Sequence, residues 1–243
     1  MRIAVLSDIH SNLVALERVL ADCRDADSVW ALGDLVGYGP RPNEVLQLLR
    51  DRGVVAVAGN HDWAVIGRMD TAEFNQDAAA AASWTASALS IDSREQLMAL
   101  PQIRVEQDHT LAHGIPRDPL WEYVLNASQA AANAAHFFTR VCLIGHTHLP
   151  SHFVEIRPGE FDANYAEPDT VLDLAAFTGR AILNPGSVGQ PRDGDPRSSY
   201  LLIDLEEATV TWKRVEYAIH QTQEQMREVK LPIRLVQRLA VGY

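Results

Sequence analysis

Three short apolar runs near the start of the chain, separated by helical patterns, most constrain how it can fold. The runs are RIAVL (2–6), SVWAL (28–32) and VVAVA (54–58). Between the first two, Leu13, Leu16 and Leu20 recur at helical spacing, and a second helix is expected to open around Pro42. Strands that alternate with helices in this way pair in parallel through right-handed crossovers, so we expect an α/β fold.

The remaining segments extend this pattern along the chain. Residues 71–99 are rich in alanine and poor in strand formers, so we expect them to be helical. Further strands are predicted at 110–113, 141–144 and 181–184, an antiparallel hairpin at 199–205 and 209–215, and helices at 127–139 and 219–239. The polar stretch 155–170 is too short for a domain linker and no internal repeat is visible, so we expect one domain over residues 1–243.

Composition and charge exclude several classes of function. Hydrophobic residues make up 47% of the chain, enough for a full core, and 32 acidic against 21 basic residues give a formal net charge of −11. Such a surface opposes sequence-independent binding to nucleic acid, and a local cation would have to offset it for an anionic substrate. No apolar run reaches the ~20 residues of a membrane span. Cys23 and Cys142 are too few for a disulfide framework, so we expect buried thiols in a soluble cytoplasmic protein.

Side chains with metal-binding groups follow nearly every expected strand. These segments are SDIH (7–10), GD (33–34), GNHD (59–62), HG (113–114), GHTH (145–148) and NPGS (184–187). In open α/β sheets the carboxyl ends of the strands form the edge where ligands bind. Carboxylate, carboxamide and imidazole groups together suit divalent metals such as Mn, Fe, Zn, Co or Ni. The candidate ligands are too many for one ordinary site, so the sequence predicts two metal ions that share a carboxylate.

Five short motifs resemble the signature blocks of the calcineurin-like metallophosphoesterase superfamily. They are DIH, GDLVGYGP, GNHD, HG and GHTH, in this order over residues 8–148. The later segment NPGSVGQPRDGDPRSSYLLID resembles a small bacterial and archaeal phosphodiesterase branch that includes diadenosine tetraphosphatase-like proteins. The resemblance implies a four-layer α-β-β-α sandwich, in which two mixed sheets face each other between helices. It also implies a dinuclear metal site at the carboxyl ends of the strands.

Carried over by position, the resemblance also implies the ligands and the reaction. One metal is held by Asp8, His10 and His148, the other by Asn60, His113 and His146, and Asp34 bridges the two. The expected reaction is hydrolysis of a phosphoester, preferably a phosphodiester, by attack of a metal-bridging hydroxide, with manganese as the preferred metal. His61 is expected to be a catalytic residue that, when protonated, stabilises a phosphoryl oxygen or protonates the leaving group. Asp62 is expected to orient the His61 ring.

Two residues are expected to bind the substrate. They are Tyr38, in the loop after the GD motif, and Arg192, whose guanidinium suits a phosphate. The alternative for Arg192 is an ion pair with Asp193 or Asp195 in its own loop. Trp63, Trp84 and Trp121 could line a base pocket, but ordinary packing is the favoured interpretation for all three.

Alternatives to phosphodiester hydrolysis stay open on the sequence alone. The substrate could be a nucleotide or a dinucleoside polyphosphate, hydrolysed at the same site. A non-catalytic metal-binding scaffold of the same fold is a further alternative, although the intact motifs argue against it. We expect a small-molecule phosphoester as the partner, no membrane or nucleic-acid partner, and leave a homo-oligomer open.

Overall fold

The first three strands and two helices form in the predicted order. The computed structural model describes residues 1–243. The opening elements are β1 (Arg2–Leu6), α1 (Leu13–Asp22), β2 (Ser28–Ala31), α2 (Pro42–Asp51) and β3 (Val55–Ala56). β1 pairs in parallel with β2, and β2 with β3. Asn12 caps α1 by accepting a hydrogen bond from the Ala15 amide, and Pro42 begins α2, where its missing N–H costs least.

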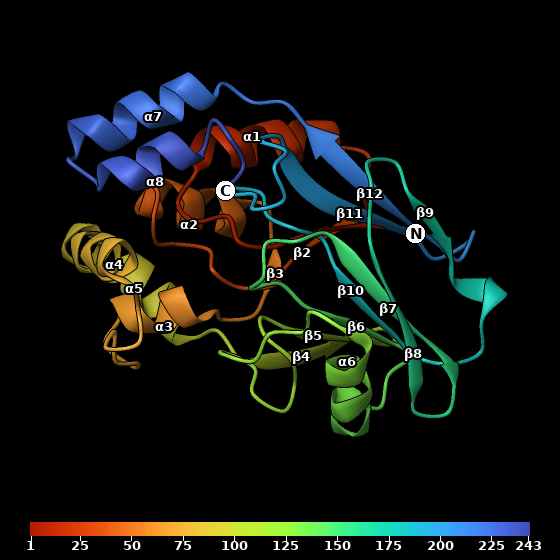
Figure 1. The fold of residues 1–243 in the computed structure, drawn as a ribbon. Coiled ribbons are helices and arrows are strands. Elements are labelled where there is room, and N and C mark those ends of the chain that lie inside the picture. Colours follow the sequence, from red (N-terminus) through yellow and green to blue (C-terminus); the bar gives the residue numbers. More distant parts are fainter.

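Twelve strands form two mixed sheets of six strands each, which confirms the predicted α/β architecture (Figure 1). The first sheet has the order β3-β2-β1-β11-β12-β9, and its later strands are β9 (Val171–Asp173), β11 (Ser198–Asp204) and β12 (Thr209–Val215). The second sheet has the order β4-β5-β6-β10-β7-β8. Its strands are β4 (Ile103–Glu106), β5 (His109–Ala112), β6 (Val141–Leu143), β7 (Ser151–Arg157), β8 (Glu160–Tyr165) and β10 (Ala181–Asn184).

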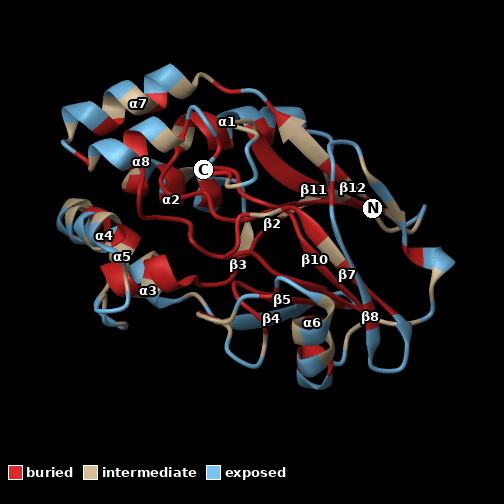
Figure 2. Cartoon of the chain, viewed as in Figure 1, coloured by how far each residue is buried: buried red, intermediate tan, exposed pale blue.

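The sheets face each other and helices cover their outer sides, which gives the four layers that the resemblance implied (Figure 1). Side chains such as Val5 and Leu111, from different sheets, fill the space between the sheets and are fully buried. On one outer side, α1 and α2 pack on the first sheet through residues such as Leu16 and Leu46. On the other, α6 (Ala127–Asn133) packs on β7 and β8. Figure 2 shows that the buried residues are concentrated in the strands and on the inner sides of the helices.

Each of the three helical segments predicted after residue 70 is divided in the structure. Residues 71–99 contain α4 (Gln76–Ala88) and α5 (Ile91–Met98), residues 127–139 contain α6 and the 3₁₀ helix η1 (Ala134–His136), and residues 219–239 contain α7 (Ile219–Glu228) and α8 (Ile233–Arg238). Ser90 separates α4 from α5, because its hydroxyl accepts the Ser93 amide and starts a new helix. Pro232 lies between α7 and α8 and cannot continue the preceding helix.

Other elements were missed by the sequence patterns. They are α3 (Asn60–Val65), the 3₁₀ helix η2 (Leu174–Ala176) and the strands β4, β7, β8 and β9. Only Phe161 of β8 is buried, so this strand leaves no apolar run to recognise. Gly159 adopts a φ of +77° in the turn between β7 and β8. Most of the polar stretch 155–170 is therefore part of the second sheet.

Loops from the carboxyl ends of strands in both sheets meet at one edge of the sandwich. The amide of Asp8, which follows β1, donates at 3.2 Å to the carbonyl of Gly33, which follows β2. The amide of Gly145, which follows β6, donates at 2.7 Å to the carbonyl of His113, which follows β5. The loop after β10 joins them, because the Gly189 amide donates to the Asp8 carbonyl at 3.0 Å. This edge collects the side chains that the sequence singled out.

Candidate metal centre

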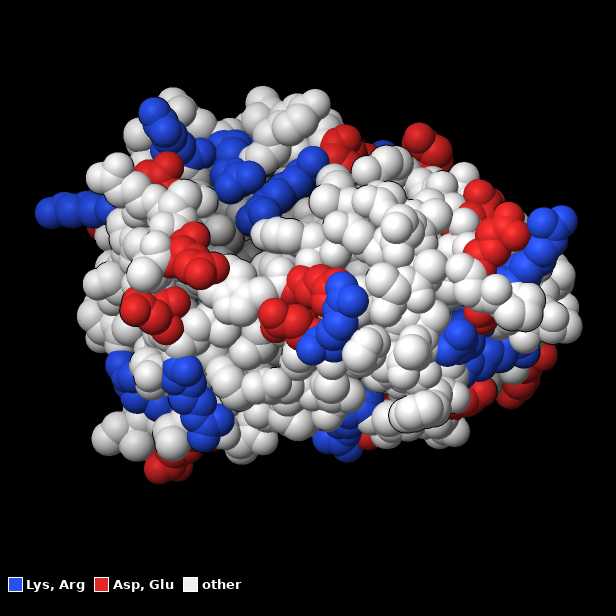
Figure 3. All heavy atoms as spheres, turned by 60° about the horizontal axis from the view of Figure 1, so that its bottom comes forward, with Lys and Arg blue, Asp and Glu red and all other residues white.

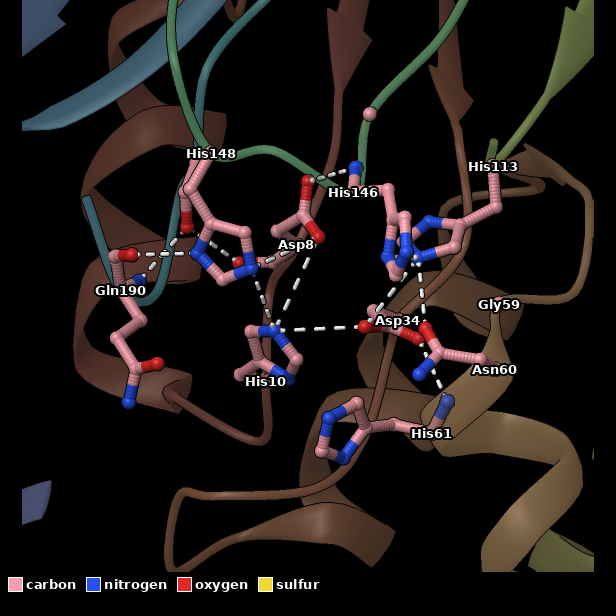
Figure 4. Close-up of polar contacts among 12 residues, drawn as sticks. Asp8, His10, Asp34, Gly59, Asn60, His61, His113, His146, His148 and Gln190 are labelled. Carbon is pink, nitrogen blue, oxygen red and sulfur yellow. Dashed lines mark hydrogen bonds and ion pairs between the residues drawn. The ribbon is translucent and has the colours of Figure 1, made fainter. Parts of the chain in front are cut away.

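Two groups of buried side chains at this edge have their ligand atoms close together. The first consists of Asp8, His10 and His148, and the second of Asp34, His113 and His146. Within each group the ligand atoms lie within 4.8 Å of one another. The loops after β1 and β2, in the first sheet, supply both aspartates and His10, and the loops after β5 and β6, in the second, supply the other histidines (Figure 4).

The first group has an arrangement that calls for a cation. His148 Nε2 lies 3.2 Å from Asp8 Oδ1 and 3.2 Å from His10 Nε2. The outer nitrogens of both rings donate to backbone carbonyls, His10 Nδ1 to Val36 at 3.2 Å and His148 Nδ1 to Gln190 at 2.6 Å. In the neutral rings each Nε2 then carries a lone pair, and these lone pairs face each other and a buried carboxylate oxygen without a hydrogen bond. A positive ion among them would remove the repulsion.

The second group is completed by a carboxamide. His113 Nε2 lies 3.0 Å from His146 Nδ1 and 3.0 Å from Asn60 Oδ1. The other ring nitrogen, His113 Nδ1, donates to the Leu32 carbonyl at 2.9 Å, so Nε2 faces the same space as the amide oxygen. Asn60 stands at the start of α3, which carries it to the edge from the loop after β3.

Asp34 lies between the two groups. Its Oδ2 is 3.6 Å from His10 Nε2 and 3.4 Å from His113 Nε2. Its other oxygen accepts a hydrogen bond from the His61 amide at 2.9 Å, which fixes the carboxylate plane. This position suits a carboxylate that is shared by two ions.

The ionisation of the buried groups favours metal binding. Burial alone would raise the pKa of Asp8 and of Asp34, but interactions with neighbouring histidines, chiefly His148 for Asp8 and His113 for Asp34, outweigh burial and hold both pKa values below the ordinary range. Burial lowers the pKa of His10, and it lowers the pKa of His146 to about 3, with the charge of His113 adding to the effect. Ionised carboxylates and neutral imidazoles are the forms that bind metals.

His113 behaves differently from the other histidines. Burial lowers its pKa, but the charge of Asp34 and a hydrogen bond to it prevail and raise the pKa to about 9. Without a metal, a proton on His113 Nε2 therefore occupies the space among acceptor atoms of Asn60 and Asp34. A divalent cation would replace this proton, which is the usual exchange when metal binds. The donor set thus fits two divalent ions, four groups for each when Asp34 is counted twice.

The backbone at the ligands adopts an uncommon conformation. Positive φ angles occur at Asp8 (53°), His10 (49°), Asp34 (49°), His146 (66°) and His148 (61°). Non-glycine residues rarely adopt this region, and when they do, the surrounding structure must hold them there. Five of the seven predicted ligands share this conformation, so the surrounding loops must hold these side chains in place against its cost.

Two polar residues of the NPGS turn hold the ligand loops. Asn184 Nδ2 donates to the Gly145 carbonyl at 2.7 Å and to Thr147 Oγ1 at 3.0 Å. Ser187 Oγ donates to the Asp8 carbonyl at 2.8 Å. The sequence analysis placed this turn at the edge but assigned no function to Asn184 or Ser187.

His61 lies beside the ligands and its ring is held by aromatic contacts. Its ring centroid is 4.4 Å from that of Tyr38 and 4.6 Å from that of Phe74. Burial lowers its pKa to about 4, against an opposing effect of Asp34, so the neutral ring prevails at neutral pH. The catalytic role expected for His61 stays a prediction, and a neutral ring can also donate a hydrogen bond.

The expectation that Asp62 orients the His61 ring is wrong. Its two carboxylate oxygens accept the backbone amides of Val36 at 3.0 Å and Gly59 at 2.9 Å. His61 Nδ1 has no hydrogen-bond partner. The side chain of Asp62 faces the backbone because it closes the first turn of α3, so it positions the loops that carry Asp34 and Asn60.

A cavity of about 200 Å³ opens beside the candidate metal centre. Tyr38 and Arg192 both line it, as predicted for substrate contacts. The alternative ion pairs for Arg192 do not form, because Asp193 pairs with Arg214 and Asp195 pairs with Arg197. The Arg192 guanidinium instead lies 5.9 Å from the Tyr38 ring centroid.

Several residues that line the cavity were not predicted as substrate contacts, among them Tyr123, Trp121 and Arg238. Tyr123 stacks on the His146 ring at 4.1 Å and 7°, and Trp121, which was interpreted as a packing residue, also lines the cavity. Arg238, at the end of α8, reaches the cavity from the far end of the chain. Each of these residues follows an ordinary surface pattern in the sequence, so no local signal marks them.

The fold and the buried ligand groups define a metallophosphoesterase, and comparison with known proteins agrees. Residues 1–208 match the model of the calcineurin-like phosphoesterase superfamily domain. A crystal structure of a metallophosphoesterase from Sphaerobacter thermophilus superposes with a TM-score of 0.91 at 47% identity, over 100% of this chain and 99% of that one. An uncharacterised protein of Methanocaldococcus jannaschii is 36% identical over 99% of this chain and 98% of its own length.

A further match covers only part of the chain. A symmetrical bis(5′-nucleosyl)-tetraphosphatase of Thioalkalivibrio sulfidiphilus is 40% identical over 67 residues, which are 26% of this chain and 25% of that protein. The chain belongs to the calcineurin-like phosphoesterase superfamily. Membership implies divalent metal ions and phosphoester hydrolysis, in agreement with the two ligand groups.

Proposed function

We propose that the protein hydrolyses small phosphodiesters with two divalent transition metal ions, preferably manganese. The main support is the geometry of two groups of buried ligand atoms, one on either side of Asp34, beside an open cavity. Asp8, His10 and His148 would hold one ion, Asn60, His113 and His146 the other, and Asp34 would bridge them. When bound, the ions would activate a shared water near neutral pH and neutralise charge on the phosphoryl oxygens.

The chain's own residues would bind and orient the phosphate. Arg192 faces the cavity without an acidic partner, so its guanidinium is available for two phosphate oxygens. The Tyr38 ring would help to position two side chains, the Arg192 guanidinium and the His61 ring, because it contacts both. The neutral His61 ring would donate an N–H to an oxygen that gains charge in the transition state. Asp62 would act only by holding the backbone.

The cellular setting that we propose is the cytoplasm. Both cysteines, Cys23 and Cys142, are free and buried, as expected in a reducing compartment. None of the helices combines the length and apolar composition that crossing a membrane requires. We further propose that residues 1–243 act as one domain, since ligands from both sheets build one site.

A nucleotide or dinucleoside-polyphosphate phosphatase is the second candidate function. The match to a symmetrical bis(5′-nucleosyl)-tetraphosphatase and the aromatic residues at the cavity favour it. The same centre would serve both reactions, so the candidates differ in the substrate alone. A non-catalytic scaffold has less support, because His61 and all seven ligands are present.

The proposal is tested by separating metal binding from turnover in two variants. His61→Ala should keep both metals and lower kcat on bis(p-nitrophenyl) phosphate by roughly 10²–10³-fold, the scale of a lost hydrogen bond to a developing oxyanion. Asp34→Ala should lose metal, because it removes a ligand from both ions. Elemental analysis of the purified variants and initial rates with added Mn²⁺ give the two measurements.

The control is His220→Ala, which removes an exposed histidine of α7 and should change neither quantity. Loss of metal from His61→Ala, with an unchanged rate per metal-loaded molecule, would show that His61 is a ligand. An absence of turnover by the manganese-loaded wild type on all phosphoesters tested would refute the proposed function.

A further inference from the structure

Two arginines from distant parts of the chain line the same cavity as the candidate metal ligands. Arg192 lies in the loop after β10, and Arg238 ends α8. Figure 3 shows Lys and Arg side chains gathered along the upper rim of a hollow on this face of the molecule. The family match ends at residue 208, so Arg238 belongs to a segment outside the shared catalytic core.

Neither arginine pairs with an acidic side chain. Arg192 makes one long side-chain hydrogen bond, 3.4 Å to Gln190 Oε1, and its buried Nε has no hydrogen-bond partner. Arg238 uses Nε to donate to the main-chain oxygen of Tyr243, the last residue of the sequence. The terminal nitrogens of Arg238 therefore stay available for an anion.

The two guanidinium groups are close enough to repel each other. Burial lowers the pKa of Arg238, and the charge of Arg192 lowers it further, ahead of the opposing effects of Tyr38 and Asp77. Glu73 also lines the cavity but pairs with neither arginine. Two like charges beside one cavity are stabilised when an anion binds between them. The protein as a whole is strongly acidic, so this concentration of positive charge is local.

Aromatic side chains also line the cavity. Phe74 and Trp121 make an edge-to-face contact at 5.7 Å, and Tyr123 stacks on the His146 ring. Tyr123 is 41% exposed, so part of its ring is open to a ligand. The cavity thus offers candidate metal ligands, guanidinium groups and aromatic rings together.

We propose that Arg238 forms a second anion subsite, next to Arg192, that binds a phosphate adjacent to the one that Arg192 holds for hydrolysis. The preferred substrates would then carry a chain of at least two phosphates, as nucleoside and dinucleoside polyphosphates do. The aromatic residues of the cavity would accept the base. This inference rests on the proposed hydrolytic function for its biological meaning, but the subsite itself is a binding property.

The test compares two nucleotides that differ by one phosphate. Binding of AMP and of α,β-methylene-ADP is measured by calorimetry on manganese-loaded protein at equal free Mn²⁺. Arg238→Gln should weaken binding of the diphosphate by roughly ten- to a hundredfold, the value of a charge-assisted hydrogen bond. Binding of AMP should change by less than about threefold, since its phosphate would occupy the metal end. Arg238→Lys should recover part of the loss, because it keeps the charge without the planar fork.

The matched control is Arg234→Gln. Arg234 is on the same helix and exposed, and it does not line this cavity, so the variant loses the same charge away from the subsite. If Arg238→Gln weakened the binding of both nucleotides equally, or if Arg234→Gln weakened diphosphate binding as much as Arg238→Gln does, the subsite would be overturned. The loss would then come from the change in net charge alone. Unchanged binding in Arg238→Gln would overturn the subsite as well. Turnover of bis(p-nitrophenyl) phosphate by the wild type tests the proposed function separately.

Discussion

Glycine residues next to the centre allow contacts that no other residue would permit. A Cβ at Gly145 would lie 1.9 Å from Ser7 Oγ and 2.8 Å from Asp8 Oδ2. A Cβ at Gly37 would lie 2.7 Å from His61 Nδ1, and Gly37 also has a φ of +92°. The absence of a side chain at Gly37 therefore leaves the space that the His61 ring occupies.

Gly37→Ala should displace the His61 ring and leave the metals bound. We expect kcat to fall by roughly ten- to a hundredfold, because a shift of about 1 Å in a catalytic group has effects of this size. Gly67→Ala is the control, since Gly67 has a φ of +76° but open space where the Cβ would lie. It should lose about 1–2 kcal/mol of stability to left-handed strain and keep its kcat. Equal kcat values for the two variants would contradict the role of the contact.

The roles of single residues were predictable where a metal-binding side chain comes just after a predicted strand. His146 and His148 follow an apolar run directly, and the structure places both in the ligand groups. Asp62 was misjudged, because the sequence does not show that its carboxylate turns toward backbone amides of Val36 and Gly59. Arg238 could not be found, since only the folded chain brings the end of α8 to the cavity.

At the level of elements, one partly buried ion pair, between Glu155 and Arg180, joins β7 to the segment before β10. Glu155 accepts hydrogen bonds from Arg180 Nε at 3.0 Å and Nη2 at 3.1 Å, and from the amides of Arg180 and Gly159. Arg180 also donates to the Ala134 carbonyl, so it ties η1 to the sheet. The hydrogen bonds from Arg180 lower the pKa of Glu155 to about 2.

Glu155→Gln should lower the free energy of unfolding by about 2 kcal/mol at pH 7, because it removes charge-assisted hydrogen bonds from a buried site. The native state holds this carboxyl ionised more strongly than the unfolded state does. The difference between wild type and variant should therefore be complete above the ordinary Glu pKa of about 4.5 and decline as the pH falls toward about 2. Urea unfolding at pH 7 and pH 3.5 measures it.

Glu160→Gln provides the control for this ion pair. Glu160 pairs with Arg157 in the same hairpin, but both side chains are exposed, and we expect a change below about 1 kcal/mol. A similar loss in both variants would show that burial adds nothing to the Glu155 contact.

Elements were predictable where one face is buried and no cap intervenes. β1, β10 and the hairpin of β11 and β12 lie at or within one residue of the predicted ranges. The helical segment 71–99 was predicted whole, because good helix formers stand on both sides of Ser90, alanine before it and Arg, Glu, Gln, Leu and Met after it, and the cap depends on one hydroxyl. β8 was missed because five of its six residues are not buried.

At the level of the whole molecule, the candidate centre links the two sheets. Asp8, His10, Asp34 and Asn60 come from loops of the first sheet, and the other three ligands come from the second. Each ligand group contains residues from both sheets. Bound metals would therefore join the two halves of the sandwich at this edge.

Removal of the metals should lower the melting temperature of the whole protein. At a free Mn²⁺ concentration one hundred times the Kd, binding adds about 2.7 kcal/mol of stability per site. For a chain of this length that corresponds to a shift of roughly 5–10 °C. Scanning calorimetry with Mn²⁺, with Ca²⁺ and after chelation measures the shift, and Ca²⁺ should give less, because imidazole ligands do not suit it. Equal melting temperatures with Mn²⁺ and after chelation would contradict this linkage.

The pairing of β1 with β11 has a consequence for the protein during its synthesis. Arg2 lies opposite Asp204 in this pair. β1 is synthesised early and β11 late, so the edge of β1 that pairs with β11 stays unpaired until β11 has been made. Ser187 and Gln190, which hold Asp8 and His148, also lie late in the chain. A nascent chain that ends before residue 187 carries all seven ligands without these supports. We therefore expect metal to load after most of the chain has left the ribosome, in a slow step set by long-range strand pairing.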